Sequence, residues 1–363
     1  MMLRLPRNSI MFYCSAGLGN RMLALGAAIE LGQAIDKQVY LYWPVNKHLR
    51  CRFGDLFENP PRFKVLSQSA VVHCPKFVLS RTSRGQPPAP ADRLEWHPMP
   101  PHPHNSWVAQ PSPGKHGTNI EQDIRASWRP LPAWRWRKPL QAWRPLARML
   151  AWRHYWSFDA VLWEVRRSYF TLSEADKLRA RQRIYINSSY HFFPGPSTVA
   201  QAWDHLVPIR SIRDKVDELA SSFTDRTIGV HIRRRDFVDM GWASRSPTEL
   251  FVRLMEDEIA RDADVRFYVA TDSEQELADL QGRFGSRIVT QPTAHRASRS
   301  STEAIRDAVV DMYTLARTNK IIASAVSTFS QMAARIGQTE YQAVDAREQI
   351  HQPEHTSRLE QVR

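Results

Sequence analysis

The chain has 363 residues, 42% of them hydrophobic, which is enough for two domains with packed cores and excludes disorder as the default state. Its three cysteines lack a CxxC spacing, which argues against a disulfide framework and structural zinc and fits a reducing cytoplasm. The sequence holds no apolar run of membrane-spanning length and no signal-peptide pattern at its start. The net charge of +13 favours binding to phosphates, but it does not choose among nucleic acid, nucleotide, anionic lipid and glycan.

The first part of the chain has the pattern of a strand, a glycine-containing loop, a helix and a second strand. The expected ranges are 10–14, 15–20, 21–35 and 39–42. The helix is inferred from apolar residues at close to helical spacing, and the second strand ends before Pro44. This order predicts the opening of a Rossmann-like unit.

Residues 80–140 are dominated by proline, histidine, tryptophan and arginine. Helices and central strands tolerate such proline density poorly, so a long loop or insertion is expected. Three of its histidines, His97, His102 and His104, are separated by prolines, and no acid or cysteine completes a metal site with them. Helical patterns return from 140 to 183.

Strands alternate with helices again in the last third of the chain, which implies a mostly parallel, doubly wound sheet. The predicted strands are 227–233, 266–270 and 320–323, and the predicted helices are 211–222, 247–260, 273–284, 302–317 and 328–336. The expected organisation is an N-terminal Rossmann-like domain at 1–205 that contains the insertion, a C-terminal Rossmann-like domain at 206–345, and a polar tail at 346–363.

The strongest functional signal is IGVHIRRRDF at 228–237, where an apolar strand delivers charged side chains to its C-terminal end. These side chains are His231, Arg233, Arg234, Arg235 and Asp236. In open α/β sheets this edge binds ligands, and a guanidinium makes bidentate contacts with phosphate. Consecutive arginines repel one another unless an anion or a carboxylate lies among them. Strand alternation would point Arg233 and Arg235 to the same side as His231. The alternative is a surface salt-bridge cluster.

Three further segments follow predicted strands. Gly17 and Gly19, in the loop CSAGLGNR, permit close ligand approach before a helix N-terminus. Asp272 ends a strand in the sequence ATDS, where it or Ser273 would cap the next helix. Hydroxyl groups in the sequence STFS, at 327–330, suit phosphate or ribose contacts or an ordinary N-cap. Each segment is ambiguous alone, but together they predict a nucleotide site at one sheet edge.

These motifs resemble the fucosyltransferase superfamily that includes α1,2-, α1,6- and protein O-fucosyltransferases, and in particular its bacterial nodulation-type members. The hallmark HxRRxD is met by His231, Arg233, Arg234 and Asp236, and GLGNR, ATD and STFS are similar to the other motifs of the family. The resemblance covers about 10–60 and 225–340. It implies a GT-B fold, with two Rossmann-like domains facing across a cleft, and GDP-sugar binding by the C-terminal domain.

The resemblance also implies roles for individual residues. Arg233 would hold the donor β-phosphate with help from Arg234, and Asn20 would lie near the transferred sugar. Asp311 would read guanine. The residues implied to line the donor pocket are His231, Asp236, Asp272, Ser327, Thr328, Phe329, Ser330, Gly17 and Gly19.

A metal-independent, inverting transfer of fucose from GDP-fucose to a glycan or glycoconjugate agrees with this arrangement, because arginines can neutralise the departing diphosphate. No DxD motif that would bind a metal is recognised. Inversion needs a general base. One related group places a glutamate shortly after HxRRxD, but Gly241 stands at that position here, which leaves Asp239 and Glu249 as candidates.

The segment 125–183 holds seven of the 12 tryptophans and a net charge of +10. It is expected to mix scaffold with acceptor binding, and peripheral contact with anionic lipid at the inner face of the membrane is a second reading. Three rival functions remain: a transferase for another nucleotide sugar, a non-catalytic glycan-binding protein and a nucleic-acid-binding protein. The last is disfavoured, because the basic excess lies outside the α/β unit.

Overall fold

A computed structural model describes most of the chain and divides it into two compact units, Met1–Val207 and Pro208–Arg363. The boundary falls two residues beyond the one expected from the sequence. The described residues are 2–3, 6–14, 16–46, 48–58, 62–66, 71–72, 97–98, 155–159, 168–169, 176, 178–188, 203, 205–239, 241–293, 295 and 301–349.

The first unit contains a parallel five-stranded sheet in the order β4-β3-β2-β9-β7. Its strands are β2 (Ser9–Cys14), β3 (Gln38–Tyr42), β4 (Phe63–Val65), β7 (Tyr155–Asp159) and β9 (Arg183–Ser188). All six residues of β2 are buried, as expected of the central strand of a parallel sheet. Helix α1 (Leu18–Ala34) follows β2 and is buried along most of its length. Two short pairs, β1 (Met2–Leu3) with β5 (Val71–Val72) and β6 (His97–Pro98) with β8 (Ser168–Tyr169), complete the described strands of this unit.

The second unit is a doubly wound domain whose parallel sheet has the order β12-β11-β10-β13-β14. Its strands are β10 (Thr227–Ile232), β11 (Arg266–Thr271), β12 (Ile288–Val289), β13 (Lys320–Ser324) and β14 (Glu340–Val344). The helices are α7 (Arg210–Ala220), α8 (Arg235–Asp239), α9 (Thr248–Arg261), α10 (Glu274–Phe284), α11 (Thr302–Leu315), α12 (Thr328–Gly337) and α13 (Ala346–Gln349). The chain adds β11 and β12 on one side of β10 and then β13 and β14 on the other side. The carboxyl ends of β10 and β13 therefore mark the topological switch point.

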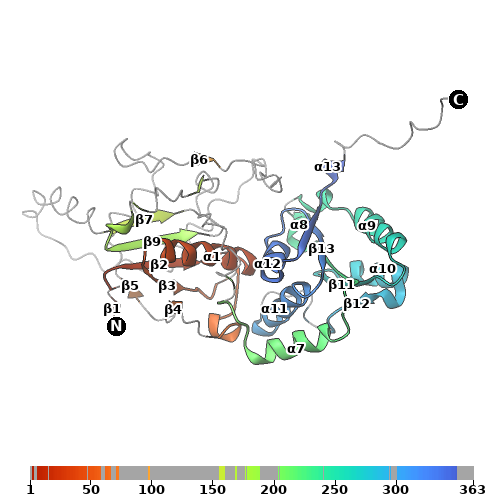
Figure 1. Cartoon of the computed structure of the whole chain (residues 1–363), viewed down its shortest axis with the longest axis horizontal. Helices are drawn as coiled ribbons and strands as arrows, with labels where there is room; N and C mark the ends of the chain where they lie inside the picture. Colours follow the sequence, from red (N-terminus) through yellow and green to blue (C-terminus); the bar gives the residue numbers. More distant parts are fainter. Residues whose placement is uncertain are drawn as a thin grey trace, which may run out of the picture. The chain divides into compact units, whose positions relative to one another are not determined.

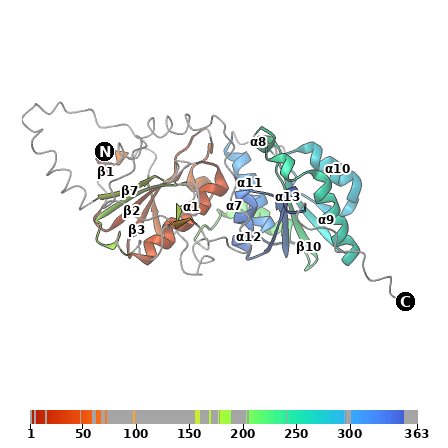
Figure 2. The same cartoon turned by 90° about the horizontal axis from the view of Figure 1, so that it is seen from above.

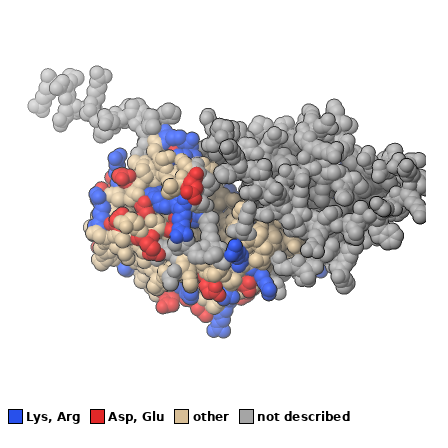
Figure 3. All heavy atoms as spheres, turned by 180° about the vertical axis from the view of Figure 1, so that it is seen from behind, with Lys and Arg blue, Asp and Glu red and all other residues tan. Residues whose placement is uncertain are grey.

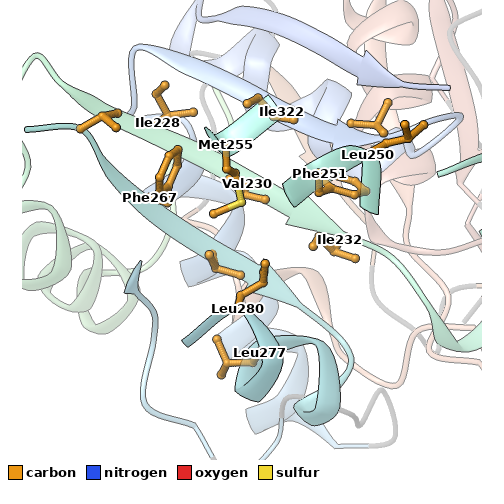
Figure 4. Packing of buried hydrophobic residues seen from close by; sticks show 13 residues of the cluster. Ile228, Val230, Ile232, Leu250, Phe251, Met255, Phe267, Leu277, Leu280 and Ile322 are labelled. Atoms are coloured by element: carbon orange, nitrogen blue, oxygen red, sulfur yellow. The ribbon is translucent and has the colours of Figure 1, made fainter. Parts of the chain in front are cut away.

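Helices cover both faces of this second sheet. Figures 1 and 2 show α9 and α10 on one side and α7, α11 and α12 on the other. Alternate residues of β10 serve the two faces: Ile228, Val230 and Ile232 join the apolar core with Leu250, Phe251, Met255, Leu277 and Leu280 of α9 and α10 (Figure 4). On the other face, a Cβ at Gly229 would lie 2.8 Å from Thr318 Oγ1 and 2.9 Å from Leu315 Cδ2, so glycine lets α11 approach closely.

The α/β class and the two Rossmann-like units are confirmed, while several local expectations are wrong. Helix α1 begins at Leu18, so Gly19 and Asn20 lie in its first turn and not in a loop. The helical reading of 140–183 fails at 155–159 and 168–169, which are strands. Pairing with β9 decides the state of 155–159, and helical periodicity does not report such a distant partner.

Sequence patterns also missed β4, β12 and β14, which lie at or next to the edges of the two sheets and are short or only partly buried. A two-residue strand, β6, lies inside the proline-rich stretch that was expected to be a loop. The expected tail begins with α13.

Within the described parts of the chain, no helix is long and apolar enough to cross a membrane, and no group of His, Cys, Asp and Glu is arranged to hold a metal ion. Figure 3 shows one face on which basic and acidic side chains of the described residues are interspersed. Most of the basic segment 125–183 and the histidines His102 and His104 lie outside the described residues.

Candidate functional site

The arginine run begins where β10 stops pairing with its neighbours. Strand β10 ends at Ile232, because the next two backbone N–H groups bond to side chains. The N–H of Arg233 donates to Ser324 Oγ at 2.9 Å, and the N–H of Arg234 donates to Asp272 Oδ1 at 2.8 Å. These two bonds connect the end of β10 to the ends of β13 and β11. The expected strand alternation through Arg235 is therefore wrong, since Arg235 is the first residue of α8 and is exposed.

Carboxylates lie among the arginines, which is one of the two arrangements that the sequence predicted. Arg233 Nη1 lies 3.1 Å from Asp272 Oδ2, and the two side chains are only 13% and 11% exposed. Asp272 Oδ2 has no aligned hydrogen bond, so this contact is an ion pair without the directional gain of a bidentate pair. Asp272 thus orients the guanidinium of Arg233 at the carboxyl edge of the sheet.

The side chain of Arg234 is held by a separate set of partners. Its Nε donates to the carboxylate of Glu276. Its Nη1 donates to the carbonyl oxygens of Arg233 at 3.2 Å and Ser246 at 3.0 Å, and its Nη2 donates to Thr248 Oγ1 at 2.9 Å. Thr248 Oγ1 in turn donates to Glu276 at 2.8 Å. The two neighbouring arginines therefore have different environments.

His231 is buried beneath the same edge, with 4% of its surface exposed. Its Nδ1 lies 3.5 Å from Ser327 Oγ, and its ring stacks on Phe329 with centroids 4.8 Å apart. Burial, with a smaller contribution from Arg233, lowers the pKa of His231 to about 3. The ring is therefore neutral at pH 7, and it supports Ser327 and Phe329 without adding charge.

The N-terminus of α12 completes the edge. Ser327 is its N-cap residue, but its side chain makes no capping hydrogen bond. Val326, just before it, has φ of 57°, a left-handed conformation that is strained for a β-branched residue. Ser330 is buried and donates to the Ser327 carbonyl at 3.2 Å. The structure thus brings His231, Arg233, Asp272 and Ser327 together, and Thr328 is the first residue of α12.

Capping also decides the role of the residue after Asp272. Ser273 is the N-cap of α10, and its side chain accepts the N–H of Glu276. Asp272 is therefore spared from capping and is available to Arg233 and Arg234.

Asp311 lies on α11 and contacts the middle of the sheet. It accepts a hydrogen bond from the Tyr268 hydroxyl at 2.7 Å. The amide nitrogen of Gln291 also reaches Asp311 Oδ1, at 3.0 Å, when the amide is rotated to satisfy its neighbours. The implied role of Asp311 toward guanine stays a prediction.

The two candidate bases are exposed. Asp239 is the last residue of α8, and Glu249 is in the first turn of α9. The backbone of Asp236 lies in α8, but its side chain lies outside the described residues. The carboxylates that orient the arginines belong to Asp272 and Glu276.

A turn between α8 and α9 is fastened across the ends of the strands. Ser246 Oγ donates to the Val344 carbonyl at 2.6 Å and accepts the N–H of Ala325 at 2.9 Å. Arg245 is ion-paired with buried Asp345. Burial alone would raise the pKa of Asp345, but hydrogen bonds from Arg245 and Arg347 lower it.

In the first unit, the loop before α1 carries the remaining predicted residues. Gly17 is the N-cap of this helix and has no side-chain cap, Gly19 is buried, and Asn20 is half-buried. Arg21, which follows, is fully buried and donates to the Ala16 carbonyl at 2.7 Å, the Pro44 carbonyl at 2.7 Å and Asn46 Oδ1 at 3.0 Å. Its guanidinium carbon lies 4.9 Å from the centroid of the Trp43 ring. Arg21 therefore fixes the loop before α1 through buried and partly buried hydrogen bonds.

Sequence reasoning missed Glu276, Thr248, Ser246, Ser324 and Arg21. Only Glu276 had a local signal, because it lies in the first turn of the helix that was expected to begin after Asp272 and Ser273. Ser246 and Thr248 lie 12 and 14 residues from Arg234, and Ser324 lies 91 residues from Arg233. Arg21 bonds to residues 5 to 25 positions away.

No protein-family model and no curated protein matches the chain. It is similar to solved structures of fucosyltransferases. A structure of the α-1,6-fucosyltransferase NodZ soaked with GDP-fucose has 17% identity and a TM-score of 0.47, with 91% of this chain and 93% of that chain covered. POFUT1 in its apo form has 12% identity, a TM-score of 0.49 and coverage of 94% and 99%. A point mutant of FUT1 from Arabidopsis thaliana, in complex with GDP, has 13% identity, a TM-score of 0.47 and coverage of 96% and 71%. This likeness is distant and assigns no residue a role.

Proposed function

We propose that the chain is an inverting, metal-independent glycosyltransferase that transfers fucose from GDP-fucose to a glycan or glycoconjugate. The observation that carries the proposal is the position of Arg233. This residue follows the central strand β10 at the switch point of a parallel sheet, and α12 begins at the end of the neighbouring strand β13. A guanidinium and free helical N–H groups at one edge suit a diphosphate.

The chemistry follows from where charge develops. As the bond between sugar and phosphate breaks, negative charge builds on the departing GDP, and a preorganised cation lowers the energy of that state. Arg233 is preorganised, because Asp272 holds its side chain and Ser324 holds its backbone. Arginine charge thus supplies the role that Mg²⁺ has in other transferases. His231, with Ser327 and Phe329, would shape the donor pocket.

The remaining roles rest on the motif resemblance alone. Asp311 would read guanine, and Asn20 would act on the transferred sugar. Deprotonation of the acceptor hydroxyl is proposed for Asp239 or Glu249, which are exposed and thus accessible to an acceptor. The proposed setting is the cytoplasm, with peripheral contact through 125–183 at the inner face of the membrane.

A donor other than GDP-fucose is the main rival, because no described contact selects the sugar. The glycan-binding and nucleic-acid-binding alternatives lack an observation in their favour. On the face shown in Figure 3, basic and acidic side chains of the described residues are mixed, whereas protein surfaces that bind nucleic acid are strongly basic.

Thermal unfolding tests the donor class. The protein is melted in EDTA with GDP, UDP, CMP or GDP-fucose, alongside Arg233→Ala. Ligands that bind only the folded state stabilise it by about 2.7 kcal/mol at a hundredfold excess over Kd. We expect a shift with GDP and GDP-fucose only, and none in Arg233→Ala. If no nucleotide shifts the midpoint, the proposal fails. Release of GDP from GDP-fucose in EDTA, again compared with Arg233→Ala, then tests for transfer.

A further inference from the structure

We propose that the two neighbouring arginines have separate tasks: Arg234 is a positioning residue, and Arg233 binds the donor diphosphate. The division goes beyond the motif, which would have both arginines hold phosphate. Its ligand-binding half rests on the proposed function, whereas its structural half does not.

Arg234 uses most of its hydrogen-bond donors within the protein. A guanidinium has five N–H donors. Four of those in Arg234 are used by the carboxylate of Glu276, two backbone carbonyls and a threonine hydroxyl. A phosphate could bind Arg234 only by displacing these partners, and each displaced buried acceptor would lose its hydrogen bond.

The charge of Arg234 is balanced by Glu276. Arg234 and Glu276 are 13% and 14% exposed and form a neutral pair. Thr248 Oγ1 lies 2.8 Å and 2.9 Å from the two carboxylate oxygens, so the glutamate is anchored independently of the arginine. A diphosphate that approached Arg234 would meet this anchored carboxylate. Asp272 is a comparable charge partner of Arg233, so the distinction between the two arginines rests on the hydrogen bonds that hold Arg234 and not on charge alone.

Arg234 links its own backbone segment to Ser246 and Thr248. Through Nη1 it joins the carbonyl of Arg233 to the carbonyl of Ser246, and Ser246 is itself fastened to Val344 and Ala325. Through Nη2 it holds Thr248, the first residue of α9. Arg234 therefore fixes the backbone from which Arg233 projects, relative to the ends of β13 and β14.

The sign of one substitution separates the two possibilities. Glu276→Gln removes the charge that restrains Arg234 and keeps the shape of the side chain. A phosphate-binding Arg234 would then be released, and GDP would bind more tightly. A positioning Arg234 would lose its anchor, and GDP would bind more weakly. We expect weakening of about tenfold, the equivalent of one charge-assisted hydrogen bond.

Calorimetric titration of the full chain with GDP and with guanosine provides the measurement. Arg234→Lys and Glu276→Gln should each weaken GDP, and the double variant should be no weaker than either, because both remove the same link. Guanosine affinity should stay unchanged. Tighter GDP binding in Glu276→Gln, or losses that add in the double variant, would overturn the proposal.

Two variants keep the result interpretable. Thr248→Val breaks one bond to Arg234 and one to Glu276 while it leaves both charges, so it should weaken GDP in the same direction by a smaller factor even where the other variants fold poorly. Arg233→Ala should abolish discrimination between GDP and guanosine. If the native chain does not bind GDP, the proposed function fails, and non-additive melting midpoints of Arg234→Lys and Glu276→Gln still test the structural half.

Discussion

Arg21 in the first unit is fully buried and Arg234 in the second is 13% exposed, and the protein satisfies these two arginines in opposite ways. Arg21 donates to three neutral oxygens, whereas Arg234 pairs with the carboxylate of Glu276. Burial lowers the pKa of Arg21 to about 10, which leaves it charged at neutral pH. Arg21 therefore stays a buried cation held by carbonyl dipoles, and Arg234 belongs to a neutral pair.

The difference shows that a basic residue in a motif is no evidence of anion binding. Neutral acceptors fix the shape of a loop around Arg21, and a carboxylate directs Arg234 toward backbone carbonyls. Arg233, whose guanidinium lies 3.1 Å from Asp272 at the carboxyl edge, is the arginine that we propose for the diphosphate.

The largest effect is expected from Arg21→Met. Three oxygens, one buried and two partly buried, would lose their donor, and the loop before α1 would lose its support, at a cost of about 3–5 kcal/mol. Amide hydrogen exchange of β2 and β3 reports the stability of this unit. Arg179→Met, at a side chain that is 52% exposed, is the matched control and should change it by less than about 0.5 kcal/mol. A small loss in Arg21→Met would mean that water replaces the guanidinium.

The next largest difference in stability is expected between lysine substitutions at Arg21 and at Arg234. Lysine is a compact charge and cannot reach the three directions that Arg21 serves, so Arg21→Lys should cost about 2–4 kcal/mol. Arg234→Lys keeps the ion pair with Glu276 and should cost about 1–2 kcal/mol. Hydrogen exchange of β2 for the first variant and of β10 for the second provides the values. Equal losses would remove the contrast between neutral and charged partners.

Acid should weaken the second unit through His231. Its folded pKa of about 3 lies below the unfolded value of 6.5, so the unfolded state binds more protons between these values. The contribution of the neutral ring is therefore complete above pH 6.5 and is lost as pH falls toward 3, by about 2 kcal/mol at pH 5. Exchange of β10 amides at pH 7 and pH 5 measures it. His231→Asn should be less stable at pH 7 but lose this pH dependence, and an unchanged slope would contradict the assignment.

The smallest losses of stability are expected when a neutral hydrogen-bond partner of Arg21 or Arg234 is removed. Asn46→Ala removes one acceptor from Arg21, and Thr248→Val removes one from Arg234. Asn46 Oδ1 also accepts from the N–H groups of His48 and Leu49. Asn46→Ala should therefore cost about 2 kcal/mol and Thr248→Val about 1 kcal/mol. Urea unfolding followed in each unit would test the order, and its reversal would argue that the Glu276 cluster is the more tightly coupled network.

The sequence alone determined the elements whose signals are local. Apolar runs predicted β2, β10, β11 and β13, and the pair Asp272 and Ser273 predicted the start of α10, where the structure makes Ser273 the cap. The arginine run also predicted an anion or a carboxylate nearby, because adjacent cations repel. These conclusions need only neighbours along the chain.

Tertiary structure decided which carboxylate serves which arginine. Asp272 and Glu276 come from β11 and α10, Thr248 from α9, and Ser324 from β13, and parallel strand order brings them to one edge. The same holds for the strand at 155–159, which forms because β9 offers a partner. Hydrogen-bond partners that lie tens of residues apart leave no periodicity in the sequence, since their meeting depends on how the sheet is wound.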